Sequence, residues 1–254
     1  MRIVAWNLNH RSRKRVIPSD VPNGILSLHP DIVVLTEYVE TPGHADFCAI
    51  LAEGGLDFHC QTPIRAGHNQ VLIASRLATT PGTISPPSEL SHATSNCLHV
   101  RVADASLELL GLRVPMFDSA ADRQSYWNWF ESGIQPLLSR HSVIIGDLNV
   151  NLQRVKDPGS QHLRRIAGSG WQLLEAEGPG SYTSVKGSTS RLDHALVSPT
   201  ITVSSAAYLA EANGYRFMGS GRDSLSDHAP LVLEITAIGP REQMGNPPFL
   251  RKKA

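Results

Sequence analysis

The feature that most limits the fold of this chain is a set of short polar motifs beside apolar, β-branched runs. Residues 3–5, 32–35 and 143–145 are runs of this kind and a polar motif follows each, while 231–233 follows its own motif. β-branched residues favour strands, so the motifs are expected at strand ends. The motifs are Trp6-Asn7-Leu8-Asn9, Thr36-Glu37, Gly146-Asp147-Leu148-Asn149 and Ser226-Asp227-His228.

If these strands are neighbours, the polar residues converge at one mouth of the sheets. Burying amides and like-charged carboxylates together costs on the order of 1–3 kcal/mol per group unless a cation compensates them. The pattern therefore predicts a site for a divalent metal ion, with oxygen and imidazole ligands.

Strands dominate the predicted elements, and helices are interspersed among them. Helices that cover the outer faces of two packed sheets are the expected arrangement, an α/β class of fold. Pro136 interrupts the third predicted helix, because proline removes a helical donor. The predicted strands are 2–6, 31–35, 70–74, 97–102, 106–113, 142–146, 192–197, 201–208 and 230–236, and the predicted helices are 20–28, 44–54, 119–139 and 160–168.

The length of the chain suits one large domain, which we place at residues 1–238. Residues 239–254, with several prolines and terminal basic residues, are predicted to form a flexible tail. Proline and glycine cluster at 81–88 and 178–190, which predicts long loops of the kind that often border a site.

The charge balance excludes a global basic field, because 23 Lys and Arg residues face 23 Asp and Glu residues. The sharpest local cluster is residues 11–15, directly after the first polar motif, and its alternative interpretation is a solvated basic loop. Three cysteines without metal-type spacing indicate core thiols in a reducing compartment. With no leader pattern and no long apolar run, we expect a soluble cytoplasmic protein.

In this order the motifs resemble the endonuclease/exonuclease/phosphatase superfamily. The matching patterns are WNxN, TE after an apolar strand, GDxN, RLDHxLVS at 191–198 and SDHxP, and the resemblance extends from residue 2 to about 236. It implies a four-layer α/β-sandwich, with two packed, mostly antiparallel or mixed sheets flanked by helices. It also implies hydrolysis of phosphoester bonds that depends on Mg²⁺ or Mn²⁺.

The resemblance implies a set of metal ligands centred on Glu37, a carboxylate at a strand end that suits hard, oxygen-preferring Mg²⁺. Asn9 stands where several relatives carry aspartate and contributes no charge. Turn formation is the alternative role for the two asparagines of the first motif. The expected metal ligands are Glu37, Asn7, Asn9, Asp147 and Asp227.

The resemblance further implies that Asp147 and Asn149 orient the attacking water, with both side chains on one face if the strand continues through them. His228 is expected to contact the scissile phosphate, with Asp193 or Asp227 fixing its tautomer. Ser226 is not expected to be a nucleophile, because an adjacent Asp-His does not place a base against it. His194, where relatives often carry tyrosine, is expected to be structural.

Arg113 departs from the family pattern, since it stands where relatives place tyrosine or a second histidine. A guanidinium can stabilise phosphoryl oxygens by bidentate hydrogen bonds, but it cannot donate a proton near neutral pH. We therefore include Arg113 among the catalytic residues, with protonation of the leaving group left open. Water on the metal is one way to supply that proton.

The leading substrate is a nucleic acid, with DNA favoured and little base specificity, because phosphate contacts carry no sequence information. Ser190 stands where apurinic-site enzymes place tryptophan, which argues against that activity. The alternative is a phosphatase or phosphodiesterase acting on a small or lipid head-group substrate. Tyr126, Trp127 and Trp129 are expected in the core rather than stacked on bases. The expected substrate contacts are Arg11, Arg13, Lys14 and Arg15, with Arg164 and Arg165 as a second set.

Overall fold

The computed structural model describes residues 1–10, 17–65, 67–221 and 223–239. The basic cluster from Arg11 to Arg15 lies outside the described residues, as does nearly all of the predicted tail 239–254. Within the described part of the chain, no helix has the length and apolar character needed to span a membrane.

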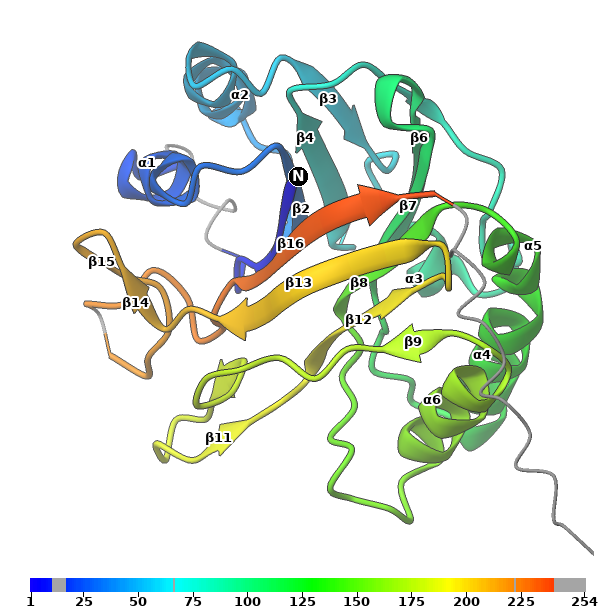
Figure 1. Cartoon of the computed structure of the whole chain (residues 1–254). Coiled ribbons are helices and arrows are strands. Elements are labelled where there is room, and N and C mark those ends of the chain that lie inside the picture. The colour runs from blue at the N-terminus through cyan, green and yellow to red at the C-terminus, as the bar shows by residue number, and fades with distance from the viewer. Residues whose placement is uncertain (11–16, 66, 222, 240–254) are drawn as a thin grey trace, which may run out of the picture.

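Two sheets of six strands form the centre of the molecule (Figure 1). Only the pairs β1–β2 and β7–β8 are parallel among the described pairings within these sheets, so both sheets are mixed. The first sheet has the order β13 (Ile201–Tyr208), β16 (Leu231–Ile238), β1 (Arg2–Asn7), β2 (Ile32–Tyr38), β4 (Gln70–Ser75), β3 (Phe58–Gln61). The second has the order β5 (Thr79–Pro81), β6 (Cys97–Val102), β7 (Leu107–Arg113), β8 (Ser142–Asp147), β12 (Asp193–Val197), β9 (Gln172–Leu173).

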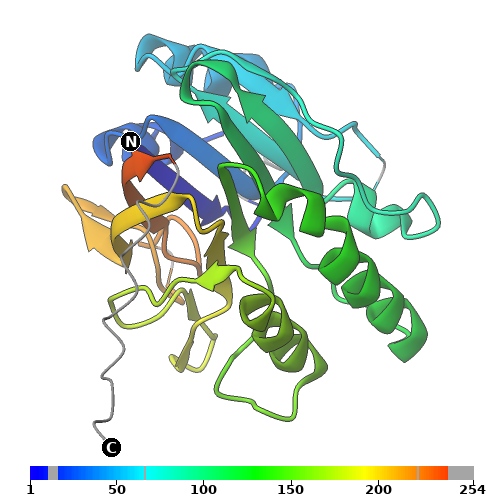
Figure 2. The same ribbon diagram turned by 45° about the vertical axis from the view of Figure 1, so that its right-hand side comes forward.

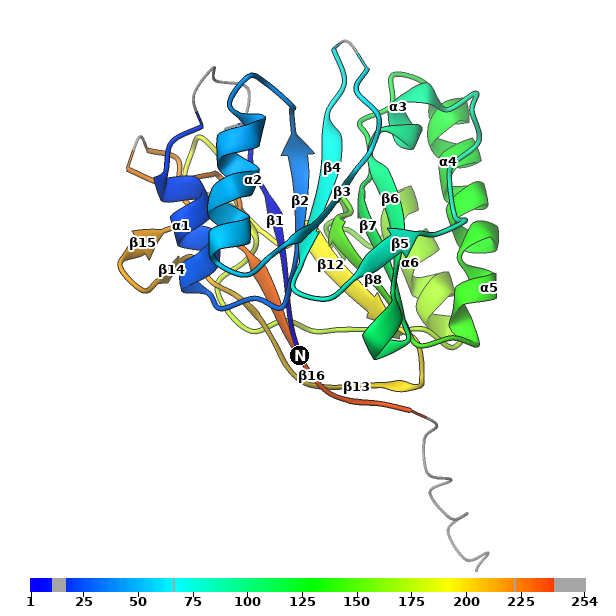
Figure 3. The same cartoon turned by 90° about the horizontal axis from the view of Figure 1, so that it is seen from above.

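Helices cover the outer faces of both sheets, which makes four layers (Figure 3). Beside the second sheet, α4 to α6 form a group (Figure 2). Two small hairpins, β10 (Tyr182–Thr183) with β11 (Thr189–Ser190) and β14 (Glu211–Ala212) with β15 (Tyr215–Arg216), complete the strands. The helices are α1 (Asp20–Ser27) and α2 (His44–Glu53) on the first sheet, and α3 (Ser91–Thr94), α4 (Ala120–Gly133), α5 (Gln135–Leu138) and α6 (Pro158–Gly168) on the side of the second.

Alternation along the strands explains why three hydrophobic cores form. In β1, Ile3 and Ala5 belong to the core between the sheets, while Val4 and Trp6 belong to the core under α1 and α2. Successive strand residues point to opposite faces, so a strand that is apolar throughout is buried on both sides. The continuous apolar runs in the sequence are thus the signature of strands between two layers.

The predicted architecture is confirmed, and the nine predicted strands and four predicted helical regions are all present. The helix predicted at 119–139 is divided at Ile134 into α4 and α5, with Pro136 in the first turn of α5, where its missing N–H costs no helical hydrogen bond. The short elements β3, β5, α3, β9, β14 and β15 were not predicted. The predicted loop 178–190 contains the β10–β11 hairpin.

Candidate active site

One row of residues across the second sheet brings three charged side chains together. Arg113 at the end of β7 pairs with Asp147 at the end of β8, and Asp147 pairs with Asp193 at the start of β12. Asn7, at the end of β1 in the first sheet, reaches across to this row, and its Nδ2 donates to Asp147 Oδ2 at 2.9 Å. The mouth between the sheets is therefore lined from both sides by polar groups.

Asp147, like Asp193, is almost fully enclosed, at 1% exposure. Its second oxygen, Oδ1, accepts from the backbone N–H of Asn149 at 2.9 Å. Burial raises the pKa of Asp147 to about 6, and the neighbouring charge of Asp193 adds to that shift. Its pKa therefore lies near neutral, in the range that suits a general base.

His228 lies opposite Asp193, and its Nδ1 is 2.8 Å from Asp193 Oδ2. Burial alone would lower the pKa of His228, but the carboxylates of Asp193, Asp147 and Asp227 together raise it to about 9. The backbone is held as well, because Trp6 Nε1 donates to the carbonyl of His228 at 2.8 Å. The imidazole is thus anchored at Nδ1 and carries a proton at neutral pH.

Glu37 is contacted on both oxygens by cationic or potentially cationic groups. Arg113 Nε lies 2.8 Å from Oε1, and His10 Nε2 lies 3.0 Å from Oε2. Burial would raise the pKa of Glu37, but His10 and Arg113 lower it to about 2, so the side chain is ionised at neutral pH. His10 follows the first motif directly and was not predicted as a site residue, although its position after Asn9 was a usable signal.

Backbone strain is concentrated around this mouth. Glu37, Asn9, His10 and Asn149 all have positive φ, between 45° and 57°. Residues other than glycine rarely adopt this conformation, which costs on the order of 1–3 kcal/mol, and such strain clusters at functional sites. At Glu37 it coincides with a register shift between β2 and β4, which turns the carboxylate out of the regular strand alternation.

Strand β8 ends at Asp147, so the condition for Asp147 and Asn149 to share a strand face is not met. Asn149 lies in a turn instead, and its Nδ2 donates to Val114 O at 2.7 Å.

The other expected metal ligands differ in burial. The side chain of Asn9 is exposed, and its backbone N–H donates to Asn7 Oδ1 at 2.8 Å. Asp227 is half-buried, and burial raises its pKa. The two asparagines of the first motif thus have different roles: Asn9 lies in a turn, and Asn7 contacts Asp147 in the site.

Neighbouring residues hold the site in place. Ser226 Oγ donates to Asn7 O at 2.7 Å and accepts from the N–H of His228 at 3.1 Å, which fits a positioning role and not that of a nucleophile. His194 is buried in the layer beside α6, with Nε2 2.7 Å from Val150 O, as expected of a structural histidine. Tyr182, whose ring lies 5.1 Å from that of His228, was not predicted and has no sequence signal.

The aromatic residues of α4 are in the core, as expected for Tyr126 and Trp127, which are 1% and 2% exposed. Trp129 is half-buried and packs against the same cluster. Arg165, one of the second set of expected substrate contacts, pairs with Glu131 at 2.9 Å. The three aromatic side chains and Arg165 therefore make contacts within the helical layer.

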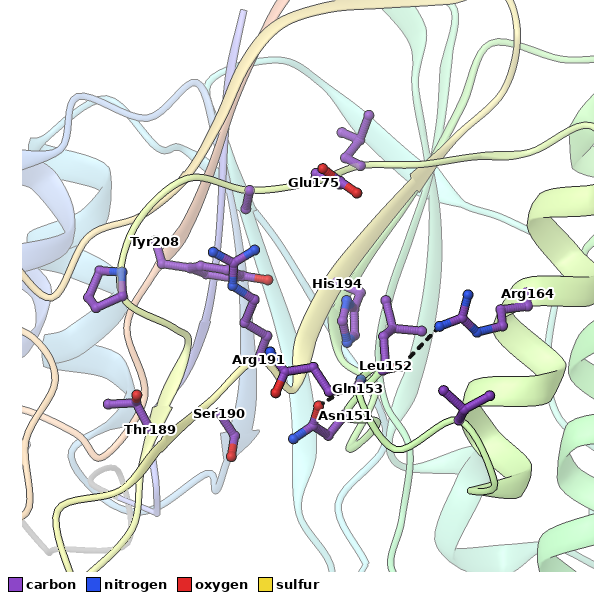
Figure 4. Close-up of a pocket in the computed structure, with 14 residues that line it drawn as sticks. Asn151, Leu152, Gln153, Arg164, Glu175, Thr189, Ser190, Arg191, His194 and Tyr208 are labelled. Atoms are coloured by element: carbon purple, nitrogen blue, oxygen red, sulfur yellow. Dashed lines mark hydrogen bonds between the residues drawn. The ribbon is translucent and has the colours of Figure 1, made fainter.

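A groove of about 640 Å³ is lined in part by residues that are close to Asn149 and Asp193 in the sequence (Figure 4). It is lined by Asn151, by Ser190 and Arg191 just before Asp193, and by Arg164 of α6 on the opposite side. Arg164 and Arg191 each donate to a backbone carbonyl at 3.1 Å, and neither pairs with a carboxylate among the described residues. Two guanidiniums without acidic partners therefore face this groove.

Asp147, Asp193 and His228 form a buried group whose ligand atoms lie within 4.8 Å of one another. Two carboxylates face one imidazole in this group, so the group keeps a net negative charge even when His228 is protonated. Carboxylate and amide oxygens are the donors that Mg²⁺ and Mn²⁺ prefer. The chemistry of the residues thus fits a divalent cation.

The four layers and this buried acidic and histidine group define a hydrolase of phosphoester bonds. The model of the Endonuclease/Exonuclease/phosphatase family matches residues 4–228. The chain belongs to this family, which makes it a metal-dependent nuclease or phosphoesterase. No curated protein sequence matches the chain.

Several solved structures share the fold. An AP endonuclease from Archaeoglobus fulgidus is 17% identical, with a TM-score of 0.70, and the match covers 92% of this chain and 99% of that one. A 3′ phosphatase, NExo from Neisseria bound to product DNA hairpin, is 18% identical (TM-score 0.66, 93% and 99% covered). The catalytic domain of APE2 from Xenopus laevis is 15% identical (TM-score 0.63, 95% and 94% covered). At these identities the likeness establishes the fold alone.

The ion pair between Asp193 and His228 makes a testable prediction about pH. In metal-free protein the pKa of His228, followed by NMR, is expected near 9. Because the folded-state pKa lies above the ordinary 6.5, the stability from this pair is fully present below pH 6.5 and is lost as pH rises through about 9. Asp193→Asn should return the pKa toward about 6.5 or below. An unchanged pKa in that variant would show that Asp193 is not the cause.

Proposed function

We propose that this chain is a divalent-metal-dependent nuclease that hydrolyses the phosphodiester backbone of nucleic acid, most favourably DNA, with low sequence specificity. The observation that carries the proposal is the buried group of Asp147, Asp193 and His228, with Asn7 and Glu37 at the same mouth. The catalytic domain is residues 1–238 in this proposal.

Glu37 is the proposed principal ligand of a Mg²⁺ or Mn²⁺ ion, with Asn7, Asn9, Asp147 and Asp227 as the other candidate ligands. Its low pKa keeps it ionised, as a hard cation requires. A bound divalent ion would supply Lewis-acid stabilisation of the phosphoryl oxygens. Of these residues, Asn9 has the weakest support, because its side chain is exposed.

The residues of the second sheet are proposed to carry the proton chemistry. Asp147, with a pKa of about 6, accepts the proton of the attacking water, and Asn149 helps to orient that water. Protonated His228 donates from Nε2 to a phosphoryl oxygen, while Asp193 holds its Nδ1. No covalent intermediate is required, since water attacks in line.

Nucleic acid is favoured over other phosphoesters for two reasons. The neighbours in fold include an AP endonuclease and a phosphatase bound to product DNA hairpin. The groove lined by Arg164 and Arg191 has two guanidiniums and one carboxylate, that of Glu175, and this excess of positive charge suits a polyanionic strand. Arg11, Arg13, Lys14 and Arg15 remain proposed contacts, and they lie outside the described residues.

A small or lipid head-group phosphoester is the second candidate. The balanced charge of the chain permits it, because 23 basic residues face 23 acidic ones. Both candidates use the same reactive groups and differ in how much of the substrate the protein touches.

Substrate class can be tested by incubating the protein with plasmid, linear duplex, single-stranded DNA, RNA and a small chromogenic phosphodiester. We expect Mg²⁺- or Mn²⁺-dependent cleavage of DNA that stops with chelator. Activity should fall steeply with salt, roughly by one power of salt concentration per phosphate contact, whereas turnover of the small ester should change little. Nicked circles would identify an endonuclease.

Turnover of the small ester alone, with no cleavage of any polynucleotide, would reject the nuclease in favour of the second candidate. Cleavage that persists in chelator would contradict the metal dependence of either one.

A further inference from the structure

Arg113 links carboxylates from both sheets. Its Nε lies 2.8 Å from Glu37 Oε1 and 3.7 Å from Asp147 Oδ2. The side chain is only 16% exposed, so water screens these contacts weakly. A single guanidinium therefore contacts two of the carboxylates that are candidate metal ligands.

The sheet fixes Arg113 in this place. Its Cα pairs with Asp147 in the parallel β7–β8 register, and its backbone N–H donates to Asn96 O at 2.8 Å. A guanidinium keeps its charge at any pH at which the protein folds. Arg113 thus places a fixed positive charge at the mouth between the sheets.

Two other groups limit how many cations the mouth can take. The second oxygen of Glu37 is contacted by His10 at 3.0 Å. Asn9, whose amide carries no charge, is exposed and adds no negative charge to the site. Both oxygens of Glu37 are thus already contacted by protein groups, which leaves this carboxylate less able to hold a second divalent ion.

We propose that Arg113 acts as a built-in second cation, so that the site binds one divalent ion and binds it more weakly than it would with a neutral residue at position 113. This inference rests on the proposed function for the identity of the site. Arg113 competes with the divalent ion for Glu37 and repels it. The same guanidinium places a fixed positive charge where the phosphoryl oxygens of a substrate would bind. It is a determinant of metal affinity and stoichiometry.

The test is direct binding of Mn²⁺ to purified protein without substrate, by isothermal titration calorimetry and electron paramagnetic resonance. The wild type is expected to bind one ion in the site. Arg113→Gln should bind Mn²⁺ at least about tenfold more tightly, equivalent to about 1.4 kcal/mol, or bind a second ion. Arg113→Lys retains a charge and should stay within about threefold of the wild type, a difference below 1 kcal/mol.

The matched control is Arg101→Gln. Arg101 also pairs with a carboxylate, Glu108 at 3.3 Å, but at the far end of the same sheet from Arg113. Its replacement should leave Mn²⁺ affinity unchanged.

Thermal melting gives a second measurement on Arg113→Gln. Without metal, this variant should melt at a lower temperature than the wild type. Mn²⁺ should then raise its melting temperature more than that of the wild type, because binding stabilises the folded state.

Equal or weaker Mn²⁺ binding by Arg113→Gln, with no second ion bound, would overturn the inference, as would two ions in the wild type or no binding to either protein. The nuclease proposal fails separately. Tighter Mn²⁺ binding by Arg113→Gln, in a protein that cleaves no polynucleotide, would support the role of Arg113 and reject the proposed substrate.

Discussion

Replacing His228 by alanine is expected to lower the rate of phosphodiester cleavage by about three orders of magnitude, while the protein stays folded. The variant loses a protonated imidazole held by Asp193 at 2.8 Å, in a site where charge develops on phosphoryl oxygens. Loss of one such group costs roughly 10²- to 10⁴-fold in rate. Initial rates at saturating metal and substrate, with circular dichroism to verify folding, provide the measurement.

His141→Ala is the matched control. His141 is half-buried, contacts Thr200 Oγ1 at 2.9 Å and precedes β8, at the end opposite to Asp147. Its removal should change the rate less than about threefold, since the group touches no part of the site. If His228→Ala kept a tenth or more of the wild-type rate, the role assigned to His228 would be wrong.

Gly146→Ala is expected to destabilise the fold by more than about 3 kcal/mol, or to prevent folding. Gly146 has a φ of +147°, and a Cβ there would lie 1.9 Å from the carbonyl oxygen of Leu112 in β7. The backbone at Gly146 and Leu112 cannot move apart without breaking the β7–β8 pairing, which also aligns Arg113 with Asp147. Urea denaturation measures the loss, and any folded fraction should be less active.

Gly168→Ala provides the comparison for this variant. Gly168 ends α6, and no atom lies within 4 Å of an added Cβ. Alanine there should be neutral or stabilising by up to about 1 kcal/mol, because glycine is a poor helix former. Equal unfolding midpoints for the wild type and Gly146→Ala would contradict the close contact with Leu112.

Long elements were predictable because apolar periodicity follows from burial on one or both faces. Most of the nine long strands contain apolar runs, as in β1, β2, β4 and β8, and these runs stand out in the sequence. Short elements such as β3 and β5 do not, because β3 is partly exposed and β5 is three residues long. The β10–β11 hairpin looked like a loop, since its two-residue strands form through pairing and not through local preference.

The candidate site was partly predictable for a related reason. Asp147 and Asp193 are directly opposite in the β8–β12 register, and both had been recognised from their motifs. His10 was missed although it directly follows the first motif, and Tyr182 was missed because its ring contact with His228 has no local pattern in the sequence. A shared strand face for Asp147 and Asn149 required the strand to continue through both residues, but a positive φ of 51° places Asn149 in a turn.

Sequence alone determined the order of strands and helices, the class of fold and the groups available for chemistry, because hydrophobic alternation and motif order are local properties of the chain. Tertiary structure decided which of those groups meet. Arg113 and Glu37 are far apart in the chain, and their contact at 2.8 Å exists only because the two sheets pack face to face. The charge at the mouth, and hence the pKa of Asp147 and His228, depends on such long-range contacts.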